Sequence, residues 1–522
     1  MTDKPALQTD STPDPMKAIL TPTELAGIFS ISDEKTMDIS ITNPPVDTDD
    51  ITVQFTCTDA WGIPVRLHTD VIALNRTEGF STRMVLPSDP GYYLLSYGIQ
   101  SKADSALSGT GYISFAVIPD VKITARDEES PFGVNTHFNQ GWDTIIGEIV
   151  SKVGIAWIRD GEASLDDRAY PAAKANNLCY LPCFTWYQTP LAKNRNADGT
   201  WDFSDIADRH QQYARKYGSY VDYYDLTNEP HGPWSAALGG SWNGGEWLNV
   251  FVEYGRVVTN AIKAGDPGAK VLWEDIDQLL WYRQFLALGA ADVIDVISPH
   301  PYSLHRSIPL PEQQMTLNQI AEFREFTQLH GLSWPLWAGE VGFSSFKLTE
   351  RTPTPFYSPN TELQQAQMLA RMMVMFLSHG CDKVFWYDFM NDGQDADNPE
   401  HNFGLVRHDY TPKPAVAAYA NLIHRLRDCK WLGSYAIGGA GNACAYMSET
   451  SKPTVIAWKQ NGFSTEILLV SSDVESVTVT DMFGGAKELE VVDHQISLEL
   501  SESPVYVDGL LVDDVMPFIT GR

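Results

Sequence analysis

The 522-residue sequence has few basic residues and few cysteines, and both shortages narrow its possible functions. Lys and Arg together number 37 against 67 Asp and Glu, which gives a formal net charge of −30. A field of this sign repels phosphate backbones and anionic lipids, so we expect neither nucleic acid nor a membrane as a partner. The six cysteines show no Cys-x-x-Cys spacing, which argues against a zinc site and a disulfide framework. Cys429 and Cys444 could pair in an oxidising compartment or remain thiols.

Long apolar runs are also missing. No segment approaches the ~18 consecutive apolar residues of a membrane-spanning helix. The first residues, MTDKPALQTDSTPDPMK, have neither the basic region nor the apolar region of a secretory signal. Two locations therefore stay open: the periplasm or the cell exterior after removal of a signal, which we favour, and the cytoplasm.

The hydrophobic pattern divides the chain into four segments. Residues 1–22 are polar and rich in Pro, Thr and Asp, which predicts a flexible lead-in. Residues 23–122 contain short alternating runs such as ITVQFTC between turn-forming clusters, which predicts an Ig-like β-sandwich. Residues 123–428 alternate short apolar runs with amphipathic stretches. Residues 429–522 return to short strands and predict a second β-sandwich.

The third segment has the pattern of a (β/α)₈ TIM barrel, which gives an α/β fold class flanked by two β-sandwich domains. The predicted strands are 132–138, 155–160, 178–186, 221–229, 270–277, 293–302, 335–343 and 383–392. The predicted helices are 143–153, 166–176, 204–217, 246–264, 279–289, 313–329, 362–379 and 413–427. An open doubly wound sheet is the alternative, but it would normally have fewer strands and often a Gly-rich phosphate turn, which is missing.

Two glutamates fall at the carboxyl ends of predicted strands, where the reactive groups of such a barrel gather. Glu229 ends the fourth strand in Thr-Asn-Glu-Pro, and Glu340 ends the seventh in Gly-Glu-Val-Gly. Two carboxyls facing each other across a cleft are the minimal machinery for glycoside hydrolysis, with one protonated and the other ionised. Either glutamate alone is more simply a surface residue, but the pair at these two strands favours catalysis.

The stretches YDLTNEP and WAGEVGF resemble the strand-four and strand-seven signatures of clan A retaining glycoside hydrolases. The resemblance covers roughly residues 125–428, and the flanking sandwiches resemble multidomain members such as family 39. It implies that Glu229 is the acid/base, that Glu340 is the nucleophile, and that Asn228 contacts a sugar 2-hydroxyl. It also implies double displacement through a covalent glycosyl-enzyme, with the two carboxyls ~5 to 5.5 Å apart.

Three further strand-end residues are candidates for the same site. Arg159 closes the second strand, where it could order Glu340 and keep it ionised; a structural salt bridge at the rim is the alternative. His300 and Tyr302 lie in the run SPHPY, and Tyr302 could hydrogen-bond to Glu340. Each of these two could instead be a buried polar residue that the backbone satisfies.

Three aromatic residues are weaker candidates for substrate binding. Trp386 ends the eighth strand, where its ring could stack on a sugar or pack in the core. His137 on the first strand and Trp186 on the third occupy similar rim positions. The histidines form neither His-x-His nor HExxH, so we expect no metal, and the mechanism needs no cofactor.

The expected partner is therefore an oligo- or polysaccharide, and the protein is an enzyme, an O-glycosyl hydrolase acting on β-linked, glucan-like glycans. Loop shape decides between an open groove with endo action and a blind pocket with exo action. An α-L-arabinofuranosidase or another exo-glycosidase of the same clan is one alternative. A non-catalytic carbohydrate-binding protein is another. We expect a monomer or a small homo-oligomer.

Overall fold

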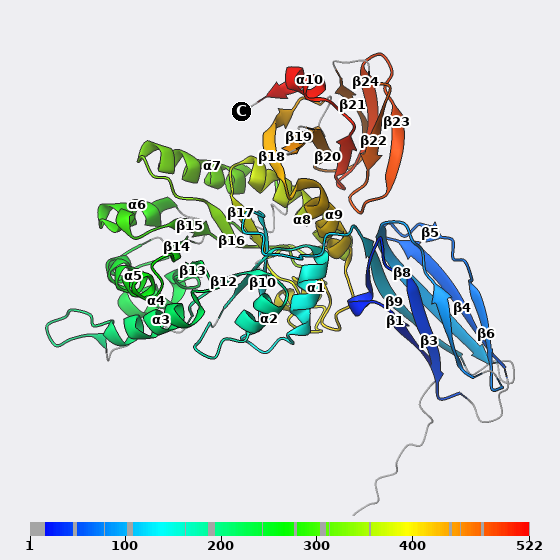
Figure 1. Cartoon of the computed structure of the whole chain (residues 1–522), viewed down its shortest axis with the longest axis horizontal. Coiled ribbons are helices and arrows are strands. Elements are labelled where there is room, and N and C mark those ends of the chain that lie inside the picture. The colour runs from blue at the N-terminus through cyan, green and yellow to red at the C-terminus, as the bar shows by residue number, and fades with distance from the viewer. Residues whose placement is uncertain are drawn as a thin grey trace, which may run out of the picture. The chain divides into compact units, whose positions relative to one another are not determined.

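The computed structural model of the chain describes residues 16–520, apart from 45–49, 78, 102–107, 162, 186–193, 243, 276–278, 303–309, 313, 354–356, 438–440, 449, 451 and 471–473. The chain forms two compact units, Met1–Val117 and Ile118–Arg522 (Figure 1). The predicted site residue Trp186 lies outside the described residues. None of the described helices combines the length and the hydropathy that crossing a bilayer requires.

The first unit consists of two sheets around one apolar core. Its strands are β1 (Lys17–Pro22), β2 (Ile28–Ser30), β3 (Thr36–Thr42), β4 (Asp50–Asp59), β5 (Pro64–Val65), β6 (Val71–Asn75), β7 (Ser81–Val85), β8 (Gly91–Ser101) and β9 (Ser108–Ile118). One sheet has the order β1-β3-β7, and the other β2-β9-β8-β4-β5 with β6 beside β4. Alternate residues of β4, such as Val53 and Phe55, are buried in the core, as the alternating pattern of ITVQFTC predicts.

The predicted lead-in is too long at its C-terminal end. Residues 17–22 form β1, which pairs antiparallel with β3 from Lys17 opposite Thr42 to Pro22 opposite Met37. Ala18 and the neighbouring Met16 join the core, and this burial holds the segment in the sheet. A polar composition therefore concealed an edge strand in which Ala18 is buried, directly after the buried Met16.

The second unit contains the eight predicted βα pairs. The strands are β10 (Phe132–Thr136), β11 (Trp157–Asp160), β12 (Cys179–Pro182), β13 (Tyr223–Asp225), β14 (Lys270–Asp275), β15 (Val296–Pro299), β16 (Trp337–Val341) and β17 (Lys383–Trp386). The helices are α1 (Ile145–Val153), α2 (Ala169–Ala175), α3 (Ser204–Tyr217), α4 (His231–Leu238), α5 (Glu246–Gly265), α6 (Leu279–Ala287), α7 (Gln314–Leu329), α8 (Glu362–Ser378) and α9 (Pro414–Leu426). Each predicted element is present, and α4 is an additional helix that directly follows Glu229.

The pairing order of these eight strands returns to its start. The strands β12, β11, β10, β17 and β16 form one parallel run, and β13, β14 and β15 form another. Single parallel bridges, Cys183 to Asp225 and Ile297 to Leu336, join the two runs. All eight carboxyl ends therefore open on the same side. This common side is where side chains from distant parts of the sequence can meet.

Burial explains why these segments form strands and helices. Every residue of β11, β12 and β17 is buried, as in parallel strands that have helices on one face and a packed interior on the other. The helix α8 begins with a capping box, in which the Thr361 hydroxyl accepts from the Gln364 N–H (3.1 Å) and the Gln364 side chain accepts from the Thr361 N–H (2.8 Å). It ends before Gly380, whose φ of 96° suits a residue without Cβ.

The C-terminal strands belong to the same compact unit. They are β18 (Cys429–Tyr435), β19 (Gly441–Ser448), β20 (Pro453–Lys459), β21 (Ser464–Leu469), β22 (Ser476–Thr480), β23 (Ala486–Glu490), β24 (Gln495–Leu500), β25 (Val505–Asp508) and β26 (Ile519–Thr520), with the short helix α10 (Val512–Val515). They form a seven-stranded sheet, β23-β22-β25-β20-β19-β18-β26, and the pair β21-β24 around a second core. Cys429 and Cys444 are both thiols.

Candidate active site

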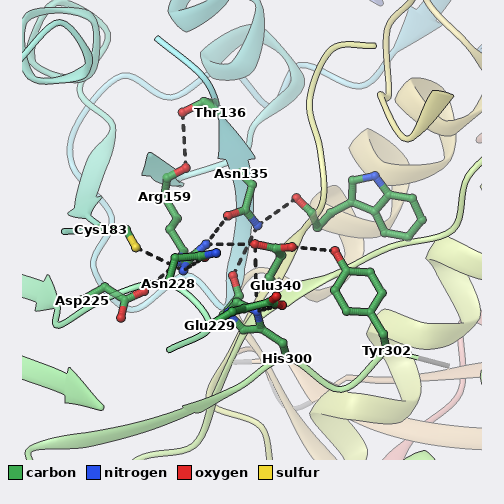
Figure 2. A network of polar contacts seen from close by, with 12 residues as sticks. Asn135, Thr136, Arg159, Cys183, Asp225, Asn228, Glu229, His300, Tyr302 and Glu340 are labelled. Carbon is green, nitrogen blue, oxygen red and sulfur yellow. Dashed lines mark hydrogen bonds and ion pairs between the residues drawn. The ribbon is translucent and has the colours of Figure 1, made fainter. Parts of the chain in front are cut away.

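Six predicted residues meet in one polar network at the carboxyl ends of the strands (Figure 2): Arg159, Asn228, Glu229, His300, Tyr302 and Glu340. Arg159 lies in β11 and Glu340 in β16. The other four follow the ends of β13 and β15. Because parallel strands end at a common edge, residues far apart in sequence become neighbours here.

The two glutamates lie close together with His300 between them. One carboxylate oxygen of Glu229, one of Glu340 and a ring nitrogen of His300 all lie within 4.8 Å of one another. His300 Nδ1 is 3.0 Å from Glu229 Oε1 and 4.0 Å from Glu340 Oε2. The Glu229 side chain is 37% exposed and the Glu340 side chain 14%, so both can be reached from solvent while remaining in a mostly protein environment.

Both carboxylate oxygens of Glu340 have a hydrogen-bond donor. The Tyr302 hydroxyl donates to Oε1 at 2.8 Å, and Arg159 Nη1 donates to Oε2 at 3.1 Å. Burial and the negative charge of Glu340 raise the pKa of Tyr302 well above its usual value, so the phenol keeps its proton and remains a donor. A carboxylate that accepts hydrogen bonds at both oxygens has a fixed orientation.

Arg159 is the centre of the network. Its side chain is 3% exposed, and its Nε donates to Asp225 Oδ2 at 2.7 Å in a buried ion pair. Its terminal nitrogens also donate to Asn135 Oδ1 (3.0 Å), Asn228 Oδ1 (2.8 Å) and the Cys183 sulfur (3.3 Å). The planar, five-donor guanidinium can serve all these partners at once, which an ammonium group cannot do. Arg159 therefore sets the position of Asn228 and Glu340 together.

Glu229 differs from Glu340 in its surroundings. Burial raises the pKa of Glu229 above its ordinary value, although nearby His231 and Arg159 act in the opposite direction. Its backbone has a φ of 44°, a left-handed conformation that non-glycine residues adopt at a cost of about 1–3 kcal/mol. This conformation turns the chain sharply between β13 and α4. It aims the carboxyl at Glu340 instead of continuing the strand.

His300 is fully buried beside the two carboxyls. Burial lowers the pKa of His300 to about 4, against the attraction of Glu340, so the imidazole is neutral near pH 7. A neutral ring whose Nδ1 shares a hydrogen bond with Glu229 Oε1 orients that carboxyl without placing a second full positive charge beside Arg159. His300 thus contacts Glu229. Its side chain is fully buried, so a direct contact with the sugar stays a prediction.

His137 lies in a second polar cluster beside this network. Its Nδ1 is 2.8 Å from Asp392 Oδ1, and its ring packs against Trp142 and Tyr387 at centroid distances of 4.8 and 5.6 Å. Burial alone would lower the pKa of His137, but the bond to Asp392 and the charge of Asp388 raise it to about 9. His137 is therefore cationic near pH 7, and its contact with a substrate stays a prediction.

Trp386 is fully buried, and its Nε1 donates to the Phe403 carbonyl at 3.3 Å. The ring also packs against Phe343 at 6.3 Å. This position agrees with core packing, one of the two roles that the sequence allows. Stacking on a sugar would require the ring to gain exposure, and it remains untested.

Asn135 and Asp225 are site residues that the sequence analysis did not select. Asn135 accepts from Arg159 and donates to the backbone carbonyls of Gly339 (3.3 Å) in β16 and Trp386 (3.4 Å) in β17, so it links β10 to β11, β16 and β17. Asp225 is the fully buried counter-ion of Arg159. A detectable signal existed for Asp225, because an ionised residue inside an apolar strand needs a buried partner of opposite charge.

Two sets of described side chains bring ligand atoms close enough together for one metal ion: Glu229, His300 and Glu340, and His137, Asp388 and Asp392. In the first set, Arg159 already provides the positive charge beside Glu340. In the second, the raised pKa of His137 and its bond to Asp392 mean that a metal would have to displace a proton to bind there. The donor groups of both sets fit hydrogen-bonded ion pairs better than a metal.

Neither a scan of protein-family models nor a search of curated proteins finds a match. Among solved structures, a family 39 glycoside hydrolase from the gut symbiont Bacteroides cellulosilyticus WH2 matches with a TM-score of 0.71 at 19% identity. The match covers 92% of this chain and 98% of that one. This chain is similar in fold to a family 39 glycoside hydrolase. The resemblance that the sequence motifs predict is thereby confirmed at the level of fold.

Further structural matches are weaker. β-Glucuronidase 2 of Bacteroides uniformis aligns with a TM-score of 0.44 at 11% identity, over 93% of this chain and 57% of that one. The β-glucuronidase of Ruminococcus gnavus aligns with a TM-score of 0.39 at 14% identity, over 77% and 67% of the two chains. Similarity at this level has no bearing on the substrate.

Proposed function

We propose that the protein is a retaining glycoside hydrolase acting on β-linked, glucan-like glycans, with its active site at the open end of a (β/α)₈ barrel. The closed pairing order of the eight parallel strands supports the barrel. The observation that carries the proposal is the pair of carboxylates with oxygens within 4.8 Å in two different environments. Carboxyl groups ~5 to 5.5 Å apart are typical of retention, whereas inversion needs ~6.5 to 9.5 Å.

In the first step, Glu340 attacks the anomeric carbon while Glu229 protonates the glycosidic oxygen. Tyr302 and Arg159 hold Glu340 with its oxygens fixed. Burial keeps a proton on Glu229 to a higher pH than on a free carboxyl. The C–O bond to the leaving group breaks, the leaving oxygen takes the Glu229 proton, and an ester forms between Glu340 and the sugar.

In the second step, water hydrolyses the ester. Because Glu340 has lost its negative charge, ionisation of Glu229 becomes easier, and Glu229 can accept a proton from the attacking water. The water oxygen then bonds to the anomeric carbon, and Glu340 leaves as a carboxylate. Two inversions restore the original configuration. Asn228, held by Arg159, would meet the sugar 2-hydroxyl in both steps.

The test removes each carboxyl and supplies an external nucleophile. We expect kcat of Glu340→Ala for a nitrophenyl β-glucoside to be at least about 10⁴-fold lower than that of the wild type. Added azide should restore part of the turnover and form the α-glycosyl azide. Glu229→Ala with azide should instead give the β-glycosyl azide, because azide then replaces the catalytic base on the opposite face. Glu253→Ala, which removes an exposed glutamate of α5, is the matched control.

The outcome separates the alternatives. A panel should include aryl α-L-arabinofuranosides and soluble β-glucans, so that the exo-acting alternative and endo action give different products. Near-normal turnover by Glu340→Ala would refute the assignment of the nucleophile. Binding of glucan without turnover by the wild-type chain would indicate the non-catalytic alternative.

A further inference from the structure

The outer face of the larger sheet in the first unit is hollowed. The hollow has a volume of about 760 Å³ and is lined by β4, β8 and β9. This volume falls within the range of small-ligand sites, about 300–1,000 Å³. The side chains that face it include Gln54, Thr56, Ser96, Gln100, Thr110 and Tyr112. Their neighbours along the strands point into the core, so the sheet has one apolar and one polar face.

The hollow is centred on Gly98. The strand registers place Gln54, Gly98 and Thr110 side by side across three strands. A Cβ on Gly98 would meet nothing within 4 Å, and the backbone there is not left-handed, so neither crowding nor strain requires glycine. The missing side chain therefore leaves a gap between two flanking polar side chains in the middle of a continuous sheet.

Tyr112 lies beside the hollow, opposite Ser96 in the next strand. It is 71% exposed, and with the 48% exposed Val71, which lies opposite Gln54, it adds apolar surface to a face that also carries glutamine, threonine and serine side chains. An exposed aromatic ring is suited to the apolar C–H face of a pyranose. The glutamine amides and the threonine and serine hydroxyls supply both donors and acceptors, which match the hydroxyl groups around a sugar ring.

None of the described residues that line the hollow is charged, although the chain carries a formal charge of −30. The described lining therefore offers no cation to a polyanion and no carboxylate to a cationic peptide. The matching ligand is neutral and rich in hydroxyl groups. We propose that this face of the first unit binds a neutral oligosaccharide segment, as a second glycan site separate from Glu229 and Glu340. The site goes beyond the proposed hydrolysis and does not depend on it.

The experiment measures binding of mixed-linkage β-glucan, xylan and mannan to the full chain by calorimetry, with Glu340→Ala as background so that substrate is not consumed. Tyr112→Ala removes the ring, and Gly98→Val fills the hollow with a residue that strands favour. We expect each variant to weaken binding of at least one neutral glycan about tenfold or more. Phe463→Ala removes a 66% exposed ring elsewhere and should leave binding unchanged.

A second measurement separates this site from the catalytic one. In the chain that keeps Glu340, Tyr112→Ala and Gly98→Val should leave kcat/KM for a nitrophenyl glucoside unchanged. The same variants should raise KM for the polymeric glycan. Equal affinity in all variants with unchanged thermal stability, or binding of polygalacturonate as tight as that of the neutral glycans, would overturn the inference. Tyr112-dependent binding together with no hydrolysis would refute the proposed function and support this site.

Discussion

Replacing Arg159 by lysine tests whether one guanidinium organises the candidate active site. The arginine is 3% exposed and donates hydrogen bonds to five side chains, which include Asp225, Asn228 and Glu340. Lysine keeps the positive charge but offers a single ammonium group on a flexible chain. We expect this group to stay with the fully buried Asp225, because an unpaired carboxylate is most costly there. Glu340 and Asn228 then lose their donor.

The magnitude follows from the lost contacts. A hydrogen bond to a charged group is worth about 1.5–3 kcal/mol, and each 1.36 kcal/mol is tenfold in rate. Loss of the Arg159–Glu340 bond alone therefore predicts a fall in kcat/KM of about 10- to 150-fold. Disorder of Asn228 would add to it. Because the charge near Asp225 is kept, the free energy of unfolding should fall by less than the roughly 3–5 kcal/mol typical of a broken buried pair.

The assay compares kcat/KM for a nitrophenyl β-glucoside with unfolding in urea. Arg83→Lys is the matched control, because Arg83 forms an ion pair with Asp38 at 2.6 Å in which both side chains are at least half exposed. Exposed pairs contribute little, so neither activity nor stability should change. An Arg159→Lys enzyme with kcat/KM within twofold of wild type would refute the reasoning. A fall that Arg83→Lys reproduces would refute it as well.

Three other changes have defined outcomes. The first step needs protonated Glu229, whose pKa is raised, so kcat/KM should fall as the pH rises through that pKa. Glu229→Gln cannot lose this proton, so its kcat/KM for an activated aryl glycoside should not show the same fall at high pH. The pKa of His137 is raised to about 9, so protonated His137 stabilises the fold fully below about pH 6.5, and this stabilisation is lost as the pH rises through about 9. The free energy of unfolding measured in urea should therefore decrease less between these pH values in His137→Gln than in the wild type. Burial raises the pKa of Asp388 well above its usual value, so Asp388→Asn should increase the free energy of unfolding, and more so at higher pH.

The periodic parts of the fold could be predicted from the sequence because burial dictates them. Strands such as Cys179–Pro182 are continuous apolar runs because both their faces are covered, and helices such as 204–217 have the 3.6-residue period of a single buried face. The end of the lead-in could not be predicted, because β1 is an edge strand with a single buried residue, Ala18. The additional helix α4 begins at Pro230–His231, directly after a strand end, where the sequence predicts a loop.

In the candidate site too, residues marked by a local sequence pattern could be predicted, whereas residues defined by contacts between strands could not. Glu229, Glu340 and Arg159 could be selected because strand ends are defined by sequence position alone. Asn135 could not, since its role depends on lying opposite Arg159 in the register between β10 and β11. That register aligns Asn135 with Arg159, and Arg159 reaches Glu340 in turn.

The left-handed backbone at Glu229 has a related cause and a testable consequence. The sequence does not indicate the φ of 44° at this position, because glutamate rarely adopts a left-handed conformation. The conformation persists because β13 ends four residues earlier and α4 begins two residues later, so the chain must change direction within a few residues. Glu229→Gly would relieve this strain, whereas Glu229→Gln would keep it. If the turn is strained, Glu229→Gly should be the more stable of these two inactive variants in urea; equal stability would mean that the backbone there costs little.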